Sequence, residues 1–348
     1  MEQKLIFSRE QLDRYFASYV GMEGGNPAGA VWFCDRDPHP WTESLVAPLG
    51  PREQPNAWGK VFRARNRDSM ERWQSHQKIA RIMAAARSET HRRPQSECDW
   101  KQYFAELLYA PDGSEFKLSL FPLPAQQIGD TPWSRAFRGQ PALVPKQRYV
   151  DLCRTGSRFR FISKIRERWR PKIVMCFGER HTDDYVQAFG LQTAATRQFI
   201  LQPADLAKTL QVLEHDGTTW IISPPLAGAS GLTSDVLLEA MGRYISQWLV
   251  PADFPRLPEG AGPAVSRRSG RRIRSATDGR PEQRIRQRGA YRFRHQPGTT
   301  SLVGLPTDSR MPARSQARRG SGCQGYWLSV VQRGGKGWRQ PQWQATFN

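Results

Sequence analysis

Acidic and hydroxyl side chains stand at the ends of two short apolar runs in this sequence. Asp35 and Asp37 follow residues 30–34 in the order Asp-Arg-Asp-Pro, and Ser119 lies within the run Lys-Leu-Ser-Leu-Phe-Pro. A carboxylate held by a proline turn at a strand end can activate water or stabilise a developing cation. Asp and Pro are also ordinary turn formers, and a serine hydroxyl can bond its local backbone. Both segments therefore have a structural interpretation beside the chemical one.

Two further polar segments follow later apolar runs. Residues 179–184 read Glu-Arg-His-Thr-Asp-Asp, which suits a helix start and could also attract an anion or a metal ion. His181 has no second histidine at ligand spacing, so we predict no metal site. Residues 223–232 form a Pro/Gly/Ser loop of the kind that approaches phosphates through backbone N–H groups.

These segments need elements that position them, and the apolar pattern predicts alternating helices and strands. Ser8 and Gln11 form a capping box that begins the first helix. Further helices are predicted at 70–88, 161–169, 182–189, 203–214 and 237–248, and strands at 30–34, 116–121, 173–177 and 220–222. This alternation predicts a three-layer α/β/α fold with a mainly parallel central sheet. Ligands in such folds bind beyond the carboxyl ends of the strands.

Composition limits the class of protein. The 348 residues are 38% hydrophobic, with 12 Trp and 16 Phe, which suits a globular protein. No run of 18 apolar residues occurs, so we expect no membrane span, and the N-terminus lacks the apolar region of a signal peptide. The five cysteines show no Cys-x-x-Cys spacing, which favours reduced thiols and a cytoplasmic location.

The basic charge is concentrated near the C-terminus. Residues 251–348 carry 19 basic and 5 acidic groups, a net charge of +14, which leaves +6 of the total +20 for residues 1–250. The chain therefore divides into an α/β domain (1–250) and an Arg/Gly/Pro-rich tail (251–348) without periodicity, expected to be disordered. Two interpretations of the tail stay open: an arm that binds phosphates, and an out-of-frame translation of GC-rich DNA.

The order of the motifs between about residues 25 and 245 resembles that of the uracil-DNA glycosylase superfamily. The first strand followed by Asp-Arg-Asp-Pro-His resembles the family's opening strand and water-activating loop. This resemblance implies that Asp37 is the catalytic carboxylate and that Pro38 and His39 contact the substrate. Ser119 stands where the family has the base-reading residue, usually Asn.

The loop 223–232 resembles the Ser/Pro loop with which the family grips the backbone beside a flipped nucleotide. The resemblance implies substrate contacts for Ser223, Pro225, Leu226 and Ser230, with Leu226 as a wedge. The family's usual His in this loop is absent, and its base-reading Asn is Ser119 here. These departures imply altered or lost base-excision activity.

The resemblance implies a partner and a mechanism. A nucleic acid, DNA, would be bound, and the base must leave the stack before its glycosidic bond is accessible. Departure of the base develops positive charge on the sugar, which a buried carboxylate stabilises while it positions water. No cofactor is implied, and the oligomeric state stays open.

Two alternatives use other features of the sequence. Asp-Arg-Asp after an apolar strand also resembles the start of haloacid-dehalogenase-type phosphatases, with Asp35 as nucleophile and Asp37 as acid/base. Their remaining groups for phosphate and magnesium would be Ser119, Lys164, Glu179 and Asp183. The second alternative is a non-catalytic nucleic-acid-binding or regulatory protein that uses the basic tail.

The division of the chain predicts the outcome of limited proteolysis. Because the tail lacks the apolar pattern needed for a core, trypsin should leave a resistant fragment that ends near residue 250. Mass spectrometry of the digest measures that end. A full-length chain that resists the protease would contradict the predicted boundary.

Overall fold

The fold is seen in a computed structural model that describes residues 7–38, 50–94, 99–123, 127–128 and 131–255. Two predicted features lie outside the described residues. The first is His39, a predicted substrate contact, and the second is residues 256–348, which make up nearly all of the predicted tail.

The described elements alternate between helices and strands along the chain. In order they are α1 (Arg9–Phe16), β1 (Gly24–Gly25), β2 (Val31–Asp35), α2 (Lys60–Met70), α3 (Gln74–Thr90), α4 (Trp100–Gln102), η2 (Tyr103–Leu107), β3 (Glu115–Ser119), β4 (Gln127–Ile128), β5 (Thr131–Pro132), α5 (Trp133–Ala136), α6 (Lys146–Thr155), α7 (Ser157–Trp169), β6 (Ile173–Phe177), η3 (Glu179–His181), α8 (Thr182–Phe189), β7 (Ala195–Leu201), β8 (Lys208–His215), β9 (Thr218–Ser223), α9 (Asp235–Ser246) and η4 (Pro251–Asp253).

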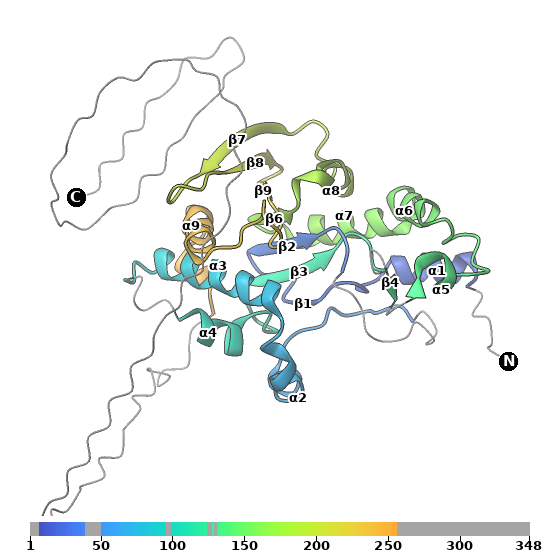
Figure 1. The fold of residues 1–348 in the computed structure, drawn as a ribbon, viewed down its shortest axis with the longest axis horizontal. Coiled ribbons are helices and arrows are strands. Elements are labelled where there is room, and N and C mark those ends of the chain that lie inside the picture. The colour runs from blue at the N-terminus through green and yellow to red at the C-terminus, as the bar shows by residue number, and fades with distance from the viewer. Residues whose placement is uncertain (1–6, 39–49, 95–98, 124–126, 129–130, 256–348) are drawn as a thin grey trace, which may run out of the picture. The chain divides into compact units, whose positions relative to one another are not determined.

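The main sheet has seven strands in the order β1-β3-β2-β6-β9-β8-β7 (Figure 1). Its four central strands, β3, β2, β6 and β9, are parallel, while β1, β8 and β7 pair antiparallel at the two edges. The predicted α/β class and the mainly parallel sheet are therefore confirmed. β4 and β5 form a separate two-stranded sheet.

Helices cover both faces of the sheet, as the predicted three-layer architecture requires. On one face, α1, α6, α7 and α8 contribute to a core with alternate side chains of the strands, among them Trp32, Phe116, Val174 and Trp220. On the other face α3 and α9 lie side by side (Figure 1). Since both faces are covered, the central strands are buried, which explains the largely apolar sequences of β2, β6 and β9.

The predicted helix at 203–214 is wrong. Residues 208–214 belong to the strand β8, and the residues before them connect β7 to β8. β8 and β9 pair antiparallel across a two-residue turn, Asp216-Gly217, in which both residues have positive φ angles of 50° and 74°. This conformation matches the twist of a hairpin, and Asp-Gly is a favoured sequence for it. The Asp-Gly pair between two apolar runs is therefore the sequence signal that favours two paired strands, rather than a helix followed by a strand.

The predicted helix at 70–88 is present as α3, which begins at Gln74 rather than at residue 70, and a separate helix that was not predicted, α2, ends at Met70 before a turn at residues 71–73. The Gln77 side-chain amide donates to the carbonyl oxygens of Met70 (3.4 Å) and Glu71 (2.9 Å), which satisfies the end of α2. The capping box of Ser8 and Gln11 is present at the start of α1 as predicted.

Residues 251–255, which the sequence analysis placed in the tail, pack against the α/β fold. The Asp253 carboxylate accepts from Lys172 Nζ (2.8 Å), and Phe254 is buried with its ring 5.7 Å from that of His91. No helix in the described ranges is long and apolar enough to cross a membrane.

A glycine allows the close contact between α3 and α9. A Cβ atom on Gly242 would lie 2.3 Å from the carbonyl oxygen of Ile82 and 2.6 Å from Ala85 Cβ. The first is a backbone oxygen and the second is a Cβ atom, so neither can rotate out of the way. The helices would therefore have to separate to accept any side chain.

We therefore expect Gly242→Ala to lower the free energy of unfolding by at least ~1 kcal/mol. Overpacking costs about 1–3 kcal/mol, and the better helix propensity of Ala offsets up to ~1 kcal/mol of it. Denaturant unfolding measures the change, with Val236→Ala, at an exposed position of the same helix, as the control. A Gly242→Ala protein as stable as the control would contradict the close packing.

Candidate functional site

The carboxyl ends of the four parallel strands meet at one edge of the sheet. Asp35 ends β2 directly beside Ser119 at the end of β3, and Phe177 ends β6 beside Ser223 at the end of β9. The chain passes from β2 to β3 on one side and then to β6 on the other side of β2. This reversal makes the end of β2 the topological switch point, where open α/β sheets bind ligands.

Asp37 lies just beyond this switch point in a cluster of alternating charges, the Arg36 cluster, which consists of Asp37, Arg36, Asp184 and Arg154. Arg36 Nη1 donates to Asp37 Oδ2 (2.7 Å), and Arg36 Nε donates to Asp184 Oδ2 (2.9 Å). Arg154 binds the other oxygen of Asp184 at 2.7 Å. The Asp37 side chain is only 15% exposed, and its buried Oδ1 has no hydrogen-bond partner within the described ranges.

His181, in the turn before α8, lies in the field of the same cluster. Burial lowers the pKa of His181, and the charge of Arg36 lowers it further, against the opposing effects of Asp37 and Asp184. The imidazole is therefore held toward its neutral form, in which one ring nitrogen can accept a proton.

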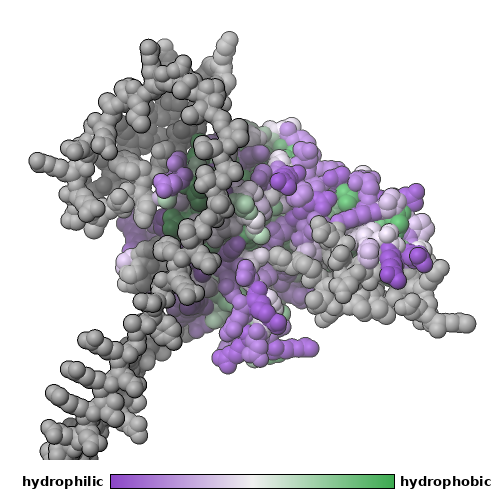
Figure 2. Space-filling model, in the orientation of Figure 1, coloured by the Kyte–Doolittle hydropathy of each residue, from purple (hydrophilic) through white to green (hydrophobic). Residues whose placement is uncertain are grey.

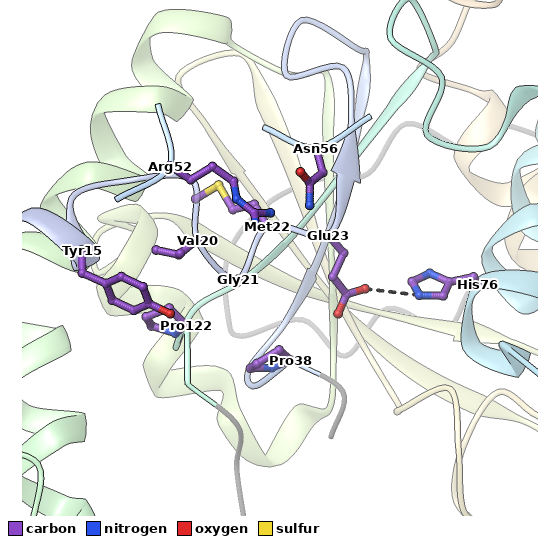
Figure 3. Close-up of a pocket in the computed structure, with 10 residues that line it drawn as sticks. All are labelled: Tyr15, Val20, Gly21, Met22, Glu23, Pro38, Arg52, Asn56, His76 and Pro122. Atoms are coloured by element: carbon purple, nitrogen blue, oxygen red, sulfur yellow. Dashed lines mark ion pairs between the residues drawn. The ribbon is translucent and has the colours of Figure 1, made fainter. Parts of the chain in front are cut away.

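A second cluster, the Lys117 cluster, lies on the α3 side of the sheet and consists of Lys117, Asp35, Glu23 and His76. The fully buried Lys117 ammonium contacts Asp35 Oδ2 and lies 3.1 Å from Glu23 Oε2. His76 Nε2 lies 3.4 Å from the same Glu23 oxygen (Figure 3). Burial acts to lower the pKa of Lys117, but Asp35 and Glu23 outweigh it and raise that pKa, so the ammonium stays charged.

A pocket of about 330 Å³ opens beside the Lys117 cluster. Glu23 and His76 face each other on one side of it, and Tyr15, Val20 and Pro122 form an apolar wall on the other (Figure 3). Asn56 and Arg52 complete its lining, together with Pro38, which follows Asp37. The pocket thus combines an apolar wall with a few polar groups, as small-molecule sites commonly do.

A buried arginine holds the backbone around this pocket. The Arg158 guanidinium is fully buried and donates to the carbonyl oxygens of Ser119 (2.6 Å), Ser18 (3.0 Å) and Leu120 (2.9 Å). It therefore joins the end of β3 to the segment that leads to Val20 and Gly21 of the pocket wall. Three charge-assisted hydrogen bonds fix that geometry.

The predicted residues near β2 come together, and the predicted loop lies apart from them. Pro38 lines the pocket, and Ser119 is fully buried with an Oγ that has no partner within the described part of the chain. Ser223 ends β9, two strands away from β2, so roughly 10 Å separates them. The Ser223 Oγ donates to the carbonyl oxygen of Pro224 (3.1 Å).

The other predicted contacts of that loop face different surroundings. Pro225 is half-buried, and Ser230 is exposed with its carbonyl accepting from Lys208 Nζ (2.7 Å). Leu226 is only 6% exposed, and its carbonyl accepts from Lys78 Nζ. Insertion of Leu226 into a base stack would therefore require the loop to move.

The residues named for the phosphatase alternative do not gather around Asp35. Lys164 on α7 and the side chains of Glu179 and Asp183 are exposed, while the cation beside Asp35 is Lys117. Within the described ranges no three His, Cys, Asp or Glu side chains lie close enough together to hold a metal ion.

Of the residues around the pocket, Lys117, Glu23, His76 and Asn56 were not predicted from the sequence, whereas Asp35 was. A usable signal stood in β3, where Glu115, Lys117 and Ser119 alternate with Phe116 and Leu118. In a sheet covered on both faces, polar residues at every second position must find buried partners. No comparable pattern marks Glu23 or Asn56, which lie in connecting segments.

Comparisons of this chain with protein-family models, with curated proteins and with solved structures found no match.

The buried carboxyl of Glu115 should make folding depend on pH. Glu115 accepts from Tyr103 Oη (2.8 Å) and the Tyr109 backbone N–H (2.7 Å), and burial raises its pKa from 4.5 to about 7. Between these values the folded state binds more protons than the unfolded state, so stability should fall as pH rises, by roughly 3 kcal/mol in total.

Glu115→Gln removes the titrating group at nearly constant volume and should flatten this part of the pH profile. Denaturant unfolding between pH 4.5 and 8 measures both proteins. Parallel profiles for the two proteins would show that Glu115 does not carry the dependence.

Proposed function

We propose that this protein is a hydrolase that acts on DNA and releases a base from a flipped-out nucleotide, with Asp37 as its catalytic carboxylate. The observation that carries the proposal is the environment of Asp37. This carboxylate is mostly buried at the switch point, Arg36 holds one oxygen, and the other has no partner within the described residues. That arrangement suits an oxygen that must orient a water molecule or face a developing cation.

The chemistry requires few protein groups. The bond between the sugar carbon and the base nitrogen breaks and its electron pair leaves with the base, while a water oxygen forms the new bond to that carbon. Positive charge on the sugar in the transition state is stabilised by the Asp37 carboxylate, and the proton of the water passes to a nearby base. Asp37 or the imidazole of His181, whose pKa is lowered, supplies that acceptor.

The pocket supports the same proposal. Its 330 Å³ lies at the lower end of the range for small-molecule sites, which suits one flat heterocycle. The apolar wall of Tyr15, Val20 and Pro122 would pack against the faces of a base, and Asn56 in the lining offers amide hydrogen bonds to its edge.

The motif order that resembles the uracil-DNA glycosylase superfamily adds to this support, because Asp37 and Ser119 come from neighbouring strand ends. Ser119 offers a single hydroxyl where Asn would present the paired donor and acceptor of an amide. We therefore propose that the base preference differs from that of relatives with Asn, or that turnover is slow.

A magnesium-dependent phosphohydrolase with Asp35 as nucleophile is supported less well. The Asp35 carboxylate is bound by the Lys117 ammonium, which lowers its nucleophilicity, and the carboxylates named for magnesium are exposed elsewhere. Phosphate release that requires magnesium and disappears in Asp35→Asn would favour this alternative.

Base release by the full-length chain tests the main proposal. The protein is incubated with uracil-containing single- and double-stranded oligonucleotides, and alkali-labile strand breaks are scored. Asp37→Asn should reduce breaks by at least ~100-fold, because it removes the charge that stabilises the transition state. Binding to the same oligonucleotides should persist.

Asp183→Asn is the matched control, since the same change is made at an exposed carboxylate of α8 and should leave the rate unchanged. Turnover that survives Asp37→Asn would sink the assignment of Asp37. Absence of breaks with the wild-type protein would contradict the proposed glycosylase activity and leave only a nucleic-acid-binding role.

A further inference from the structure

We propose that α2 and the adjoining pocket rim bind the phosphate backbone of a nucleic acid through Lys60, Arg65, Arg67 and Arg52. This inference rests on the nucleic-acid partner of the proposed function and assigns that partner a surface within the α/β domain, apart from the basic tail.

Exposed basic side chains lie along α2. Lys60, Arg65 and Arg67 are exposed, and no ion pair joins them to an acidic side chain within the described ranges. Residues 50–72 hold six basic and three acidic residues, so the segment is positive overall. A strongly hydrophilic lobe is visible at the position of α2 (Figure 2).

The inner face of α2 fixes the helix to the domain. Arg63 donates to the carbonyl oxygens of Phe104 (2.9 Å) and Ala105 (2.8 Å) within η2, and of Leu108 (2.6 Å) directly after it. Phe62 stacks on Trp58 with ring centroids 5.3 Å apart. One arginine of the helix therefore anchors it, while Lys60, Arg65 and Arg67 are exposed to a ligand in solution.

The anchored helix lies next to the pocket. Trp58, which stacks on α2, has its ring centroid 5.1 Å from that of the pocket residue His76. Asn56, two residues earlier in the chain, lines the pocket together with Arg52. A nucleotide whose base enters this pocket therefore brings its flanking phosphates toward Arg52 and α2.

The salt dependence of binding tests this surface, because each phosphate contact releases counterions. Each lost contact lowers the slope of log K against log[salt] by about 0.9 for duplex DNA and about 0.7 for a single strand. For the full-length triple variant Lys60→Gln/Arg65→Gln/Arg67→Gln we expect a slope that is smaller by about 2, and weaker binding at 50 mM KCl. Fluorescence anisotropy with a uracil-free oligonucleotide between 50 and 200 mM KCl gives both values without turnover.

The matched control removes three exposed cations from α7, by Arg160→Gln/Lys164→Gln/Arg168→Gln. Its slope should equal that of the wild-type chain. Equal losses in the two triple variants would show an effect of net charge alone, and an unchanged slope in the α2 variant, or no binding by the wild-type chain, would also overturn the inference.

Base release on uracil-containing oligonucleotides separates this inference from the proposed function. A smaller salt slope in the α2 variant without any base release would contradict the glycosylase activity and support α2 as the binding surface. Base release with an unchanged salt slope would contradict the binding role of α2 and support the glycosylase activity. Circular dichroism of both triple variants establishes that each is folded.

Discussion

The buried ammonium of Lys117 is the interaction on which the candidate site depends. It joins β3, which carries Lys117, to Asp35 at the end of β2 and to Glu23 before β1. An unpaired charge at this depth would cost several kcal/mol, so the three segments are stable together only while the ammonium and both carboxylates remain in contact. The contact with Lys117 fixes the Glu23 carboxylate in the lining of the pocket, where it faces His76.

Asp35 and Asp37 stand only two residues apart and belong to different electrostatic environments. Asp35, still within β2, faces the α3 side and the Lys117 ammonium, while Asp37, beyond the strand, meets Arg36 and the cluster beside α8. The first is bound by an ammonium, and the second retains an oxygen without a partner within the described part of the chain. This asymmetry is the physical reason why we propose Asp37, rather than Asp35, as the catalytic carboxylate.

The parallel strands were predictable, because buried strands read as continuous apolar runs bounded by breakers. The strand β8, which lies between β9 and the edge strand β7, was not recognised, because helical spacing was assumed for residues 203–214 although the Asp216-Gly217 turn favours a hairpin. Asp37, Pro38 and Ser119 could be placed at strand ends from the sequence. Glu23, His76 and Asn56 could not, because their positions depend on contacts between segments far apart in the chain and no local pattern marks them.

The order of the strands also distributes the entropic cost of folding unevenly. β8 and β9 close across two residues, whereas the β2–β6 pairing joins residues 142 apart, such as Val31 and Ile173. Loop closure costs about 0.6 kcal/mol more for each doubling of length, so the pairing at the switch point costs roughly 4 kcal/mol more than the hairpin. The candidate site is therefore assembled by the least local contacts of the sheet and exists only in the completed fold, never in a locally folded fragment.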